Sequence, residues 1–233
     1  MTTPGRLVVF EGAEGTGKST QIALLMDALS ASGVRAATFR EPGGTDTGDA
    51  IRRLLLDPAA RISTATEAHL FMASRAELCA REISPALERG LTVVLDRFFL
   101  STYAYQVVGR GLPEEQIRAA NRLATGGLVP DLTLLLDLPV GNGLSRATAR
   151  GAPDRIEQAT DDFHARVSAA FRDFAEPAWV EAHAEAGPIV AVDARGSRED
   201  VFSRVVDVLV SRLPEELGVL RRRAAVAGSA QGD

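Results

Sequence analysis

A stretch near the N-terminus constrains the fold more than any other part of the chain. It reads Gly12-Ala13-Glu14-Gly15-Thr16-Gly17-Lys18-Ser19-Thr20 and fits the pattern G-x-x-x-x-G-K-[ST]. An apolar run, residues 7–10, precedes it, and residues 21–26 look like the start of a helix. A strand, glycine loop and helix in this order turn backbone N–H groups inward at a helix N-terminus. The stretch therefore predicts a phosphate-binding loop.

The composition supports this interpretation over a chance glycine turn. Lys18 is the only lysine in the chain, and every other basic side chain apart from the histidines is an arginine. A compact ammonium fits inside a tight loop where a planar guanidinium does not. We expect residues 12–20 to bind a nucleotide, with Lys18 on the β- and γ-phosphates and the Ser19 hydroxyl on Mg²⁺.

Bulk properties exclude several other classes of protein. The 233 residues are 45% hydrophobic and 24% charged, which suits one globular α/β domain. A net charge of −5 provides no basic field for nucleic acid. The single cysteine, Cys79, excludes an intramolecular disulfide and fits a reducing cytoplasm. No apolar run reaches transmembrane length, so we expect a cytoplasmic protein without a membrane partner.

Five short apolar runs alternate with helical patterns. The runs are residues 7–10, 34–39, 91–95, 132–136 and 189–193. The alternation predicts a P-loop NTPase-type, five-stranded parallel sheet flanked by helices. The expected helices are residues 21–32, 49–56, 66–86 with Thr66 as its cap, 101–106, 113–124, 140–150, 161–175 and 201–213. We expect one domain over residues 1–213, a short helical lid at about residues 141–160, and a disordered tail over residues 214–233.

Charged residues follow two of the predicted strands. Arg40 ends the second, and Asp96 and Arg97 end the third. The carboxyl ends of parallel strands form the ligand-binding edge of such a sheet. A carboxylate and guanidinium groups are costly inside a core but suit Mg²⁺ and phosphate. These side chains are therefore candidate ligand contacts.

Two further groups are ambiguous when taken alone. Phe71 and Arg75 are four residues apart and share a helix face, as do Arg146 and Arg150. Arg155 follows a break at residues 151–153. The simpler interpretation is a core residue beside a surface residue in the first case, and a solvated arginine face in the second.

Taken together, the motifs resemble the bacterial thymidylate kinase family of P-loop nucleoside monophosphate kinases. The segments that carry the resemblance are residues 11–20, 40–45 (Arg-Glu-Pro-Gly-Gly-Thr), 96–98, 101–106 and 154–157. They occur in the family's order and spacing, and the likeness runs from about residue 6 to residue 213. The resemblance implies transfer of the γ-phosphoryl group of ATP to dTMP, giving dTDP, with Mg²⁺ as cofactor. It also implies a homodimer.

The resemblance assigns roles on the acceptor side. It implies that Phe71 stacks on thymine, that Arg75 donates to its O4, and that Thr102 lies near the base edge. Tyr105 is expected against the deoxyribose, where it leaves no room for a 2′-hydroxyl, and Glu14 near the 3′-hydroxyl. The full expected dTMP site is Glu14, Arg40, Pro42, Phe71, Arg75, Arg97, Thr102, Tyr105 and Gln106.

The resemblance also implies the charge-stabilising groups. Arg40 and Arg97 would hold the acceptor phosphate, and Asp96 would bind Mg²⁺ through water, beside Ser19. Because the phosphate-binding loop contains no arginine, the lid must supply the catalytic one. The expected catalytic residues are Lys18, Arg97, Arg146, Arg150 and Arg155.

Three alternatives remain open at this point. A regulatory GTPase-type switch needs a guanine-reading Asn-Lys-x-Asp, but the sole lysine already lies in the loop. A P-loop kinase for another nucleoside monophosphate or a deoxynucleoside differs only through Phe71, Arg75 and Tyr105. An inactive relative is disfavoured because Lys18 and Asp96 are retained.

Overall fold

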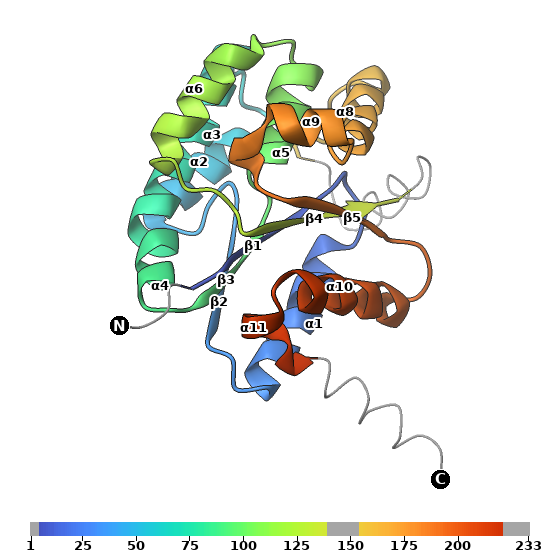
Figure 1. Ribbon diagram of the computed structural model, residues 1–233. Helices are drawn as coiled ribbons and strands as arrows, with labels where there is room; N and C mark the ends of the chain where they lie inside the picture. The colour runs from blue at the N-terminus through green and yellow to red at the C-terminus, as the bar shows by residue number, and fades with distance from the viewer. Residues whose placement is uncertain (1–4, 139–153, 221–233) are drawn as a thin grey trace.

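The computed structural model describes residues 5–138 and 154–220, and a five-stranded parallel sheet forms its centre (Figure 1). The strand order is β2-β3-β1-β4-β5. The strands are β1 (Leu7–Glu11), β2 (Ala36–Arg40), β3 (Thr92–Asp96), β4 (Leu132–Asp137) and β5 (Ile189–Asp193). Every pairing is parallel. The predicted fold class is confirmed.

The central strands are apolar along their length because helices cover both faces of the sheet. Residues 7–10 of β1 and residues 93–95 of β3 are fully buried. Continuous apolar runs are typical of parallel strands covered on both sides. The edge strands β2 and β5 are only partly buried, and their residues are less uniformly apolar.

Helices form a layer on each face of the sheet (Figure 1). One layer contains α1 (Lys18–Ala31), α10 (Arg198–Arg212) and α11 (Pro214–Leu217). The opposite layer contains α2 (Asp46–Leu56), α3 (Thr64–Leu78), α4 (Ser84–Glu88), α5 (Phe99–Thr102), α6 (Glu114–Thr125), α8 (Asp161–Asp173) and α9 (Pro177–Ala182). Within the described ranges, no helix is long and apolar enough to cross a membrane.

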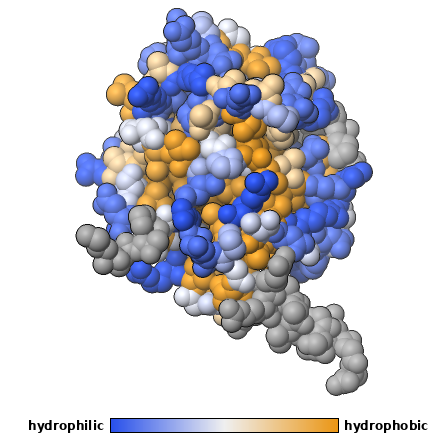
Figure 2. Space-filling view, viewed as in Figure 1, coloured by the Kyte–Doolittle hydropathy of each residue, from blue (hydrophilic) through white to orange (hydrophobic). Residues whose placement is uncertain are grey.

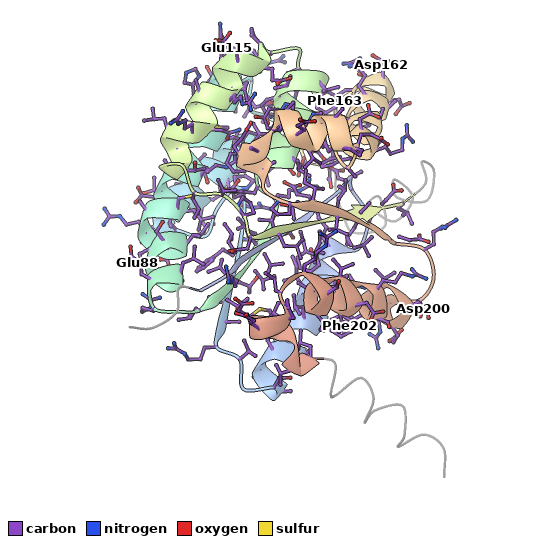
Figure 3. The ribbon with its side chains drawn as sticks, in the orientation of Figure 1. Glu88, Glu115, Asp162, Phe163, Asp200 and Phe202 are labelled. Atoms are coloured by element: carbon purple, nitrogen blue, oxygen red, sulfur yellow. The ribbon has the colours of Figure 1, made fainter. Side chains whose placement is uncertain are left out.

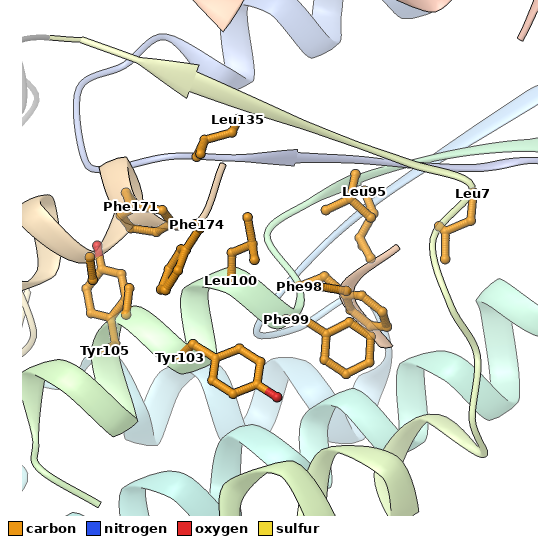
Figure 4. Close-up of a cluster of buried hydrophobic side chains, with 14 of the residues drawn as sticks. Leu7, Leu95, Phe98, Phe99, Leu100, Tyr103, Tyr105, Leu135, Phe171 and Phe174 are labelled. Atoms are coloured by element: carbon orange, nitrogen blue, oxygen red, sulfur yellow. The ribbon is translucent and has the colours of Figure 1, made fainter. Parts of the chain in front are cut away.

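Aromatic side chains fill the core between the sheet and the second helical layer (Figure 4). Phe171 and Phe174 of this cluster meet edge to face, with ring centroids 5.7 Å apart. Tyr105 packs against Phe171 in the same manner, at 6.3 Å. The Tyr105 ring is therefore part of this aromatic core. Hydrophilic residues predominate around the upper and right-hand edges of the face in Figure 2, and hydrophobic residues show through its central part.

Capping side chains and acidic residues define several helix starts. Thr45, Ser63 and Ser197 each accept a hydrogen bond from the backbone of the first turn. Acidic residues of the first turns, including those labelled at the starts of α6, α8 and α10 in Figure 3, suit the positive end of the helix dipole. The predicted cap Thr66 is therefore wrong, because Ser63 takes that role and α3 begins before residue 66.

The long helix predicted over residues 66–86 is divided. A π-helical segment, Cys79–Ile83, separates α3 from α4. Pro85 lies in the first turn of α4, directly after the π-helical segment, and it has no N–H to donate to the preceding turn. A second π-helical segment, Tyr103–Gly109, follows α5 and contains most of the helix predicted over residues 101–106. Such wide turns are frequent at functional sites.

The chain after residue 213 corrects another expectation. The segment assigned to a disordered tail begins with α11, and it buries Leu217 completely and Leu220 almost completely beneath the sheet. Two leucines at helical spacing supply enough apolar surface to dock this turn against α10. The helix predicted over residues 140–150, most of the expected lid and residues 221–233 lie outside the described residues.

Candidate active site

The phosphate-binding loop connects the end of β1 to the start of α1. Its backbone requires glycine at Gly12, which has a φ of 137° and passes close to β4. A Cβ atom there would lie 2.6 Å from the carbonyl oxygen of Leu136. Gly17 caps α1 in a left-handed conformation, so the first N–H groups of the helix stay free of side-chain caps. Free N–H groups at a helix N-terminus bind anions.

Lys18 lies inside this loop with its ammonium group buried. Its Nζ donates to the carbonyl oxygens of Gly12 at 2.8 Å and Ala13 at 3.0 Å. Burial, together with the nearby Arg97 charge, lowers the pKa of Lys18 to about 7. A bound phosphate would supply the missing negative charge and stabilise the ammonium form.

Ser19 and Asp96 meet at the mouth of the loop. The Ser19 hydroxyl donates to Oδ2 of Asp96 at 3.3 Å. The other carboxylate oxygen, Oδ1, is buried and has no hydrogen-bond partner among the described residues. An orphaned carboxylate oxygen beside a hydroxyl fits a hard divalent cation. The described chain contains no cluster of three or more acidic, His or Cys side chains that could hold a metal alone. The cation would therefore rely on phosphate oxygens and water as well.

The turn after β3 holds Arg97 in a left-handed conformation with a φ of 71°. This conformation is uncommon for a residue other than glycine. The Arg97 backbone N–H donates to the carbonyl of Phe10 at 2.9 Å, and its Nη1 donates to the Ser101 hydroxyl at 2.9 Å. The side chain is thereby directed across the sheet edge toward the phosphate-binding loop.

Glu11, which sequence reasoning did not single out as a site residue, organises the same turn. Its side chain is fully buried at the end of β1. It accepts hydrogen bonds from the backbone N–H groups of Phe98 at 2.7 Å and Ser101 at 3.0 Å, and from the Ser101 hydroxyl at 2.7 Å. The Ser101 hydroxyl thus links the Glu11 carboxylate to the Arg97 guanidinium. The sequence did contain a signal for Glu11, because it is a charged residue at the end of an apolar strand.

Tyr105 brings the expected sugar-side residues together. Its hydroxyl donates to Oε1 of Glu14 at 3.2 Å, and the Arg97 guanidinium lies 5.3 Å from its ring centroid. Burial raises the pKa of the Tyr105 hydroxyl, so this group stays protonated at neutral pH. The phosphate-binding loop, the β3 turn and the second π-helical segment thus meet at one place.

Arg75 is held more tightly than its expected role suggests. Its side chain is 2% exposed, and every guanidinium N–H has a protein acceptor. The acceptors are the carboxylate of Glu41, the hydroxyl of Thr102, the amide oxygen of Asn121 and the carbonyl of Phe98. Burial alone would lower the pKa of Arg75, but Glu41 outweighs it, and the pKa is raised. A carbonyl oxygen of a bound nucleobase would have to share one of these N–H donors with its protein acceptor.

One open cavity of about 640 Å³ connects these groups. Its size suits a nucleotide-sized ligand. The expected residues that line it are Glu14, Gly15, Gly17, Lys18, Ser19, Thr20, Arg40, Pro42, Phe71, Arg75, Asp96, Arg97, Thr102, Tyr105 and Gln106. Gly12, Ala13 and Thr16 contribute to the loop without lining the cavity.

The cavity also contains residues that sequence reasoning missed. Arg52 of α2 lines it and donates from Nη1 to the carbonyl of Pro42 at 2.9 Å. Burial and, to a smaller extent, the neighbouring Arg40 lower the pKa of Arg52, although Asp154, Asp49 and Asp96 act in the opposite direction. Glu41 and Ser101 line it as well. Arg52 carried no sequence signal beyond its place in an amphipathic helix.

Of the three expected lid arginines, only Arg155 falls within the described residues. Its Nη2 lies 2.7 Å from Oε2 of Glu67, and its Nε donates to the carbonyl of Leu55 at 2.7 Å. Arg155 does not line the cavity, although residues 154, 156 and 157 do. Arg146 and Arg150 lie outside the described residues.

The fold and the site together define a P-loop nucleotide kinase. The fold is a parallel sheet with an anion-binding loop after its first strand. The site adds a hydroxyl–carboxylate pair for a cation and arginines that face the loop. The sequence model of the thymidylate kinase family matches residues 10–195. The chain therefore belongs to the thymidylate kinase family.

Individual relatives agree with this assignment. Thymidylate kinase from Deinococcus radiodurans is 44% identical over 201 residues, covering 86% of this chain and 94% of the relative. Thymidylate kinase from Rhizorhabdus wittichii is 44% identical over 216 residues, covering 91% and 100%. Thymidylate kinase from a Synechococcus species is 47% identical over 209 residues, covering 89% and 95%.

Proposed function

We propose that this protein transfers the γ-phosphoryl group of ATP to dTMP, giving dTDP and ADP, in the synthesis of dTTP. The observation that carries the proposal is that one cavity contains both a phosphate-binding loop with Lys18 and, facing it, Phe71, Tyr105 and Arg97. A donor phosphate on the loop and an acceptor nucleotide against the aromatic side chains would lie close enough for direct transfer.

The donor half stabilises charge that spreads over the transferred group. The N–H groups of the loop and the Lys18 ammonium would hold the β- and γ-phosphates of ATP. Mg²⁺, when bound, supplies further neutralisation of these phosphates, and Ser19 and Asp96 are the residues that would hold it. The cation is part of the proposal and rests on the orphaned Asp96 oxygen.

The acceptor half supplies the nucleophile and its orientation. A phosphate oxygen of dTMP attacks the γ-phosphorus, a new P–O bond forms, and the bond to the β–γ bridging oxygen of ATP breaks. Arg40 and Arg97, with Arg52 beside them, would hold the dTMP phosphate in line. No general base is assigned, because the phosphate oxygen is already ionised at neutral pH.

Base and sugar selection is assigned to the far end of the cavity. Phe71 would stack on thymine, and Arg75, Thr102 and Gln106 would face its polar edge. Tyr105, tied to Glu14, would pack against the deoxyribose. Pro42 also lines the cavity.

The proposal also includes a catalytic arginine, a homodimer and a cytoplasmic location. Arg146 and Arg150 are proposed to contact the transferring phosphoryl group, because the loop itself contains no arginine. The homodimer is proposed from the likeness to the thymidylate kinase family alone. Sedimentation velocity would test the dimer, and a monomer at micromolar concentration would contradict it.

A panel of acceptors tests the function. With ATP as donor, the purified protein should phosphorylate dTMP faster than dUMP, dCMP, UMP or AMP. Preference for another acceptor would favour the alternative, a P-loop kinase for a different nucleoside monophosphate or a deoxynucleoside. Absence of transfer to every acceptor would contradict the proposal altogether.

A further inference from the structure

A buried carboxylate, Glu67, connects segments that are distant in the sequence. Its side chain on α3 is 2% exposed. Arg110 donates to both of its oxygens at 3.0 Å, and Gln106 donates to Oε1 at 3.2 Å. The Arg155 guanidinium approaches Oε2 to 2.7 Å. Burial would raise the pKa of Glu67, but the two hydrogen bonds from Arg110 and the ion pair with Arg155 outweigh burial and lower it, so the carboxylate stays ionised.

Arg155 is fixed by its backbone as well as by its side chain. Its backbone N–H donates to the carbonyl of Leu56 at 3.1 Å, and its Nε donates to the carbonyl of Leu55 at 2.7 Å. Both carbonyls belong to the C-terminal turn of α2, where helix carbonyls lack intrahelical partners. Arg155 therefore joins the end of α2 to Glu67 on α3.

The residues on either side of Arg155 form a wall of the cavity. Asp154, Ile156 and Glu157, here called the acceptor wall, line it beside Leu56. Asp154 shapes the turn by accepting from the backbone N–H groups of Ile156 at 2.8 Å and Glu157 at 2.9 Å. This wall has no regular helix or strand of its own, so tertiary contacts hold it in place. They are the anchoring of Arg155, the burial of Ile156 in the core and the hydrogen bond between the His164 ring and the carbonyl of Glu157.

The other partners of Glu67 are Gln106 and Arg110. Gln106 lines the cavity directly. Arg110 places its guanidinium 4.5 Å from the ring centroid of Phe163, which lies at the start of α8 (Figure 3). Phe71 follows Glu67 by one helical turn and also lines the cavity. Every residue that Glu67 fixes thus belongs to, or adjoins, the part of the site assigned to the acceptor.

We propose that Glu67 is a positioning residue that clamps the acceptor wall through Arg155, and that Arg155 serves as this anchor rather than as a contact to the transferring phosphoryl group. The inference rests on the proposed function for the identity of the acceptor. An anchored arginine affects how well the acceptor is bound and aligned. An arginine that contacts the transferring group instead acts chiefly on the chemical step.

Steady-state kinetics with both substrates varied separates the two roles. Arg155→Ala and Glu67→Gln should each raise KM for dTMP by about tenfold, because a wall displaced by a fraction of an ångström misplaces the acceptor. KM for ATP and kcat should change less than about threefold in both variants. Arg155→Lys should recover part of the loss, because a lysine can still reach Glu67 but donates fewer hydrogen bonds.

Two controls accompany these variants. Glu77→Gln and Arg81→Ala disrupt an exposed pair at i,i+4 spacing and should leave all kinetic constants unchanged. The double variant Glu67→Gln/Arg155→Ala should lose less than the sum of the two single losses in free energy, because both changes remove the same link. Additive losses would show that the two residues act independently.

The opposite kinetic result would overturn the inference. If Arg155→Ala lowers kcat by about a thousandfold with KM for dTMP unchanged, Arg155 contacts the phosphoryl group in the manner of an arginine finger. If neither variant changes any kinetic constant, the cluster has no role in the site.

Failure of the proposed function would be recognised separately. A wild-type protein that does not phosphorylate dTMP contradicts the function, whereas the clamp can still be tested by thermal unfolding. Non-additive losses of Tm in the Glu67 and Arg155 cycle would support the link between them. Additive losses would overturn the clamp whatever the protein's substrate.

Discussion

At the scale of single residues, Lys18 carries the most unusual electrostatics. Its pKa of about 7 lies below the ordinary 10.5 because the ammonium is buried beside Arg97. Below pH 7 the lysine is charged in both the folded and the unfolded state, so the full cost of burying the charge is subtracted from the free energy of unfolding. Between about pH 7 and 10.5 the unfolded state binds more protons, so this cost is relieved as pH rises.

The lowered pKa predicts that nucleotide binding takes up a proton. Above about pH 7 the lysine of the free protein is largely neutral, and a bound phosphate should return it to the charged form. Titration calorimetry of ATP binding at pH 8, in two buffers of different ionisation enthalpy, measures this uptake. Lys18→Met should abolish it, and equal uptake in that variant would contradict the assignment.

The same residue should control turnover. Lys18→Ala is expected to remove more than nine-tenths of kcat while leaving the circular dichroism spectrum unchanged, because the loop keeps its glycines but loses its charge. Retention of more than about a tenth of wild-type turnover, a loss below about 1.4 kcal/mol, would argue against a phosphate contact.

Tyr105 governs the predicted choice of sugar. Its ring lies between Arg97 and Phe171, and its hydroxyl is tied to Glu14, so it cannot easily move aside for a 2′-hydroxyl. We expect dTMP to be preferred over UMP, and Tyr105→Ala to relax this preference more than it weakens ATP binding. Comparison of kcat/KM for the two acceptors tests this, and equal rates in the wild type would refute it.

At the scale of elements, the turn after β3 depends on a side chain from β1. Glu11 accepts two backbone N–H groups and one hydroxyl from this turn while fully buried. Glu11→Ala leaves these donors unpaired and should lower the free energy of unfolding by about 2–4 kcal/mol. Urea denaturation measures the loss, with Glu199→Ala as the exposed control. A loss below about 0.5 kcal/mol would mean that water replaces the carboxylate at little cost.

At the scale of the whole molecule, the C-terminal turn completes the layer beneath the sheet. Leu217 of α11 is fully buried among the side chains of the second core cluster. Leu217→Ala should therefore lower the free energy of unfolding by about 2–5 kcal/mol while leaving the kinetic constants of the distant site unchanged. A neutral substitution would contradict the role of this segment in the core.

The sequence by itself determined the strands, the phosphate-binding loop and the placement of Asp96 and Arg97 at the ligand-binding edge. Each of these follows from neighbours along the chain. A buried parallel strand needs a continuous apolar run, and an anion nest needs its glycines and lysine in one short stretch. Parallel strands then bring their carboxyl ends to one edge whatever the loops between them do.

Only the tertiary structure decided the partners of the buried charges. The sequence around Glu11, Glu41 and Glu67 does not reveal their partners, yet each carboxylate is buried against donors from distant segments. Arg155 shows the same effect, because a helical pattern cannot reveal that its guanidinium meets α2 and α3. A charge can be buried only where packing supplies its counterpart, and packing joins residues that no local pattern connects.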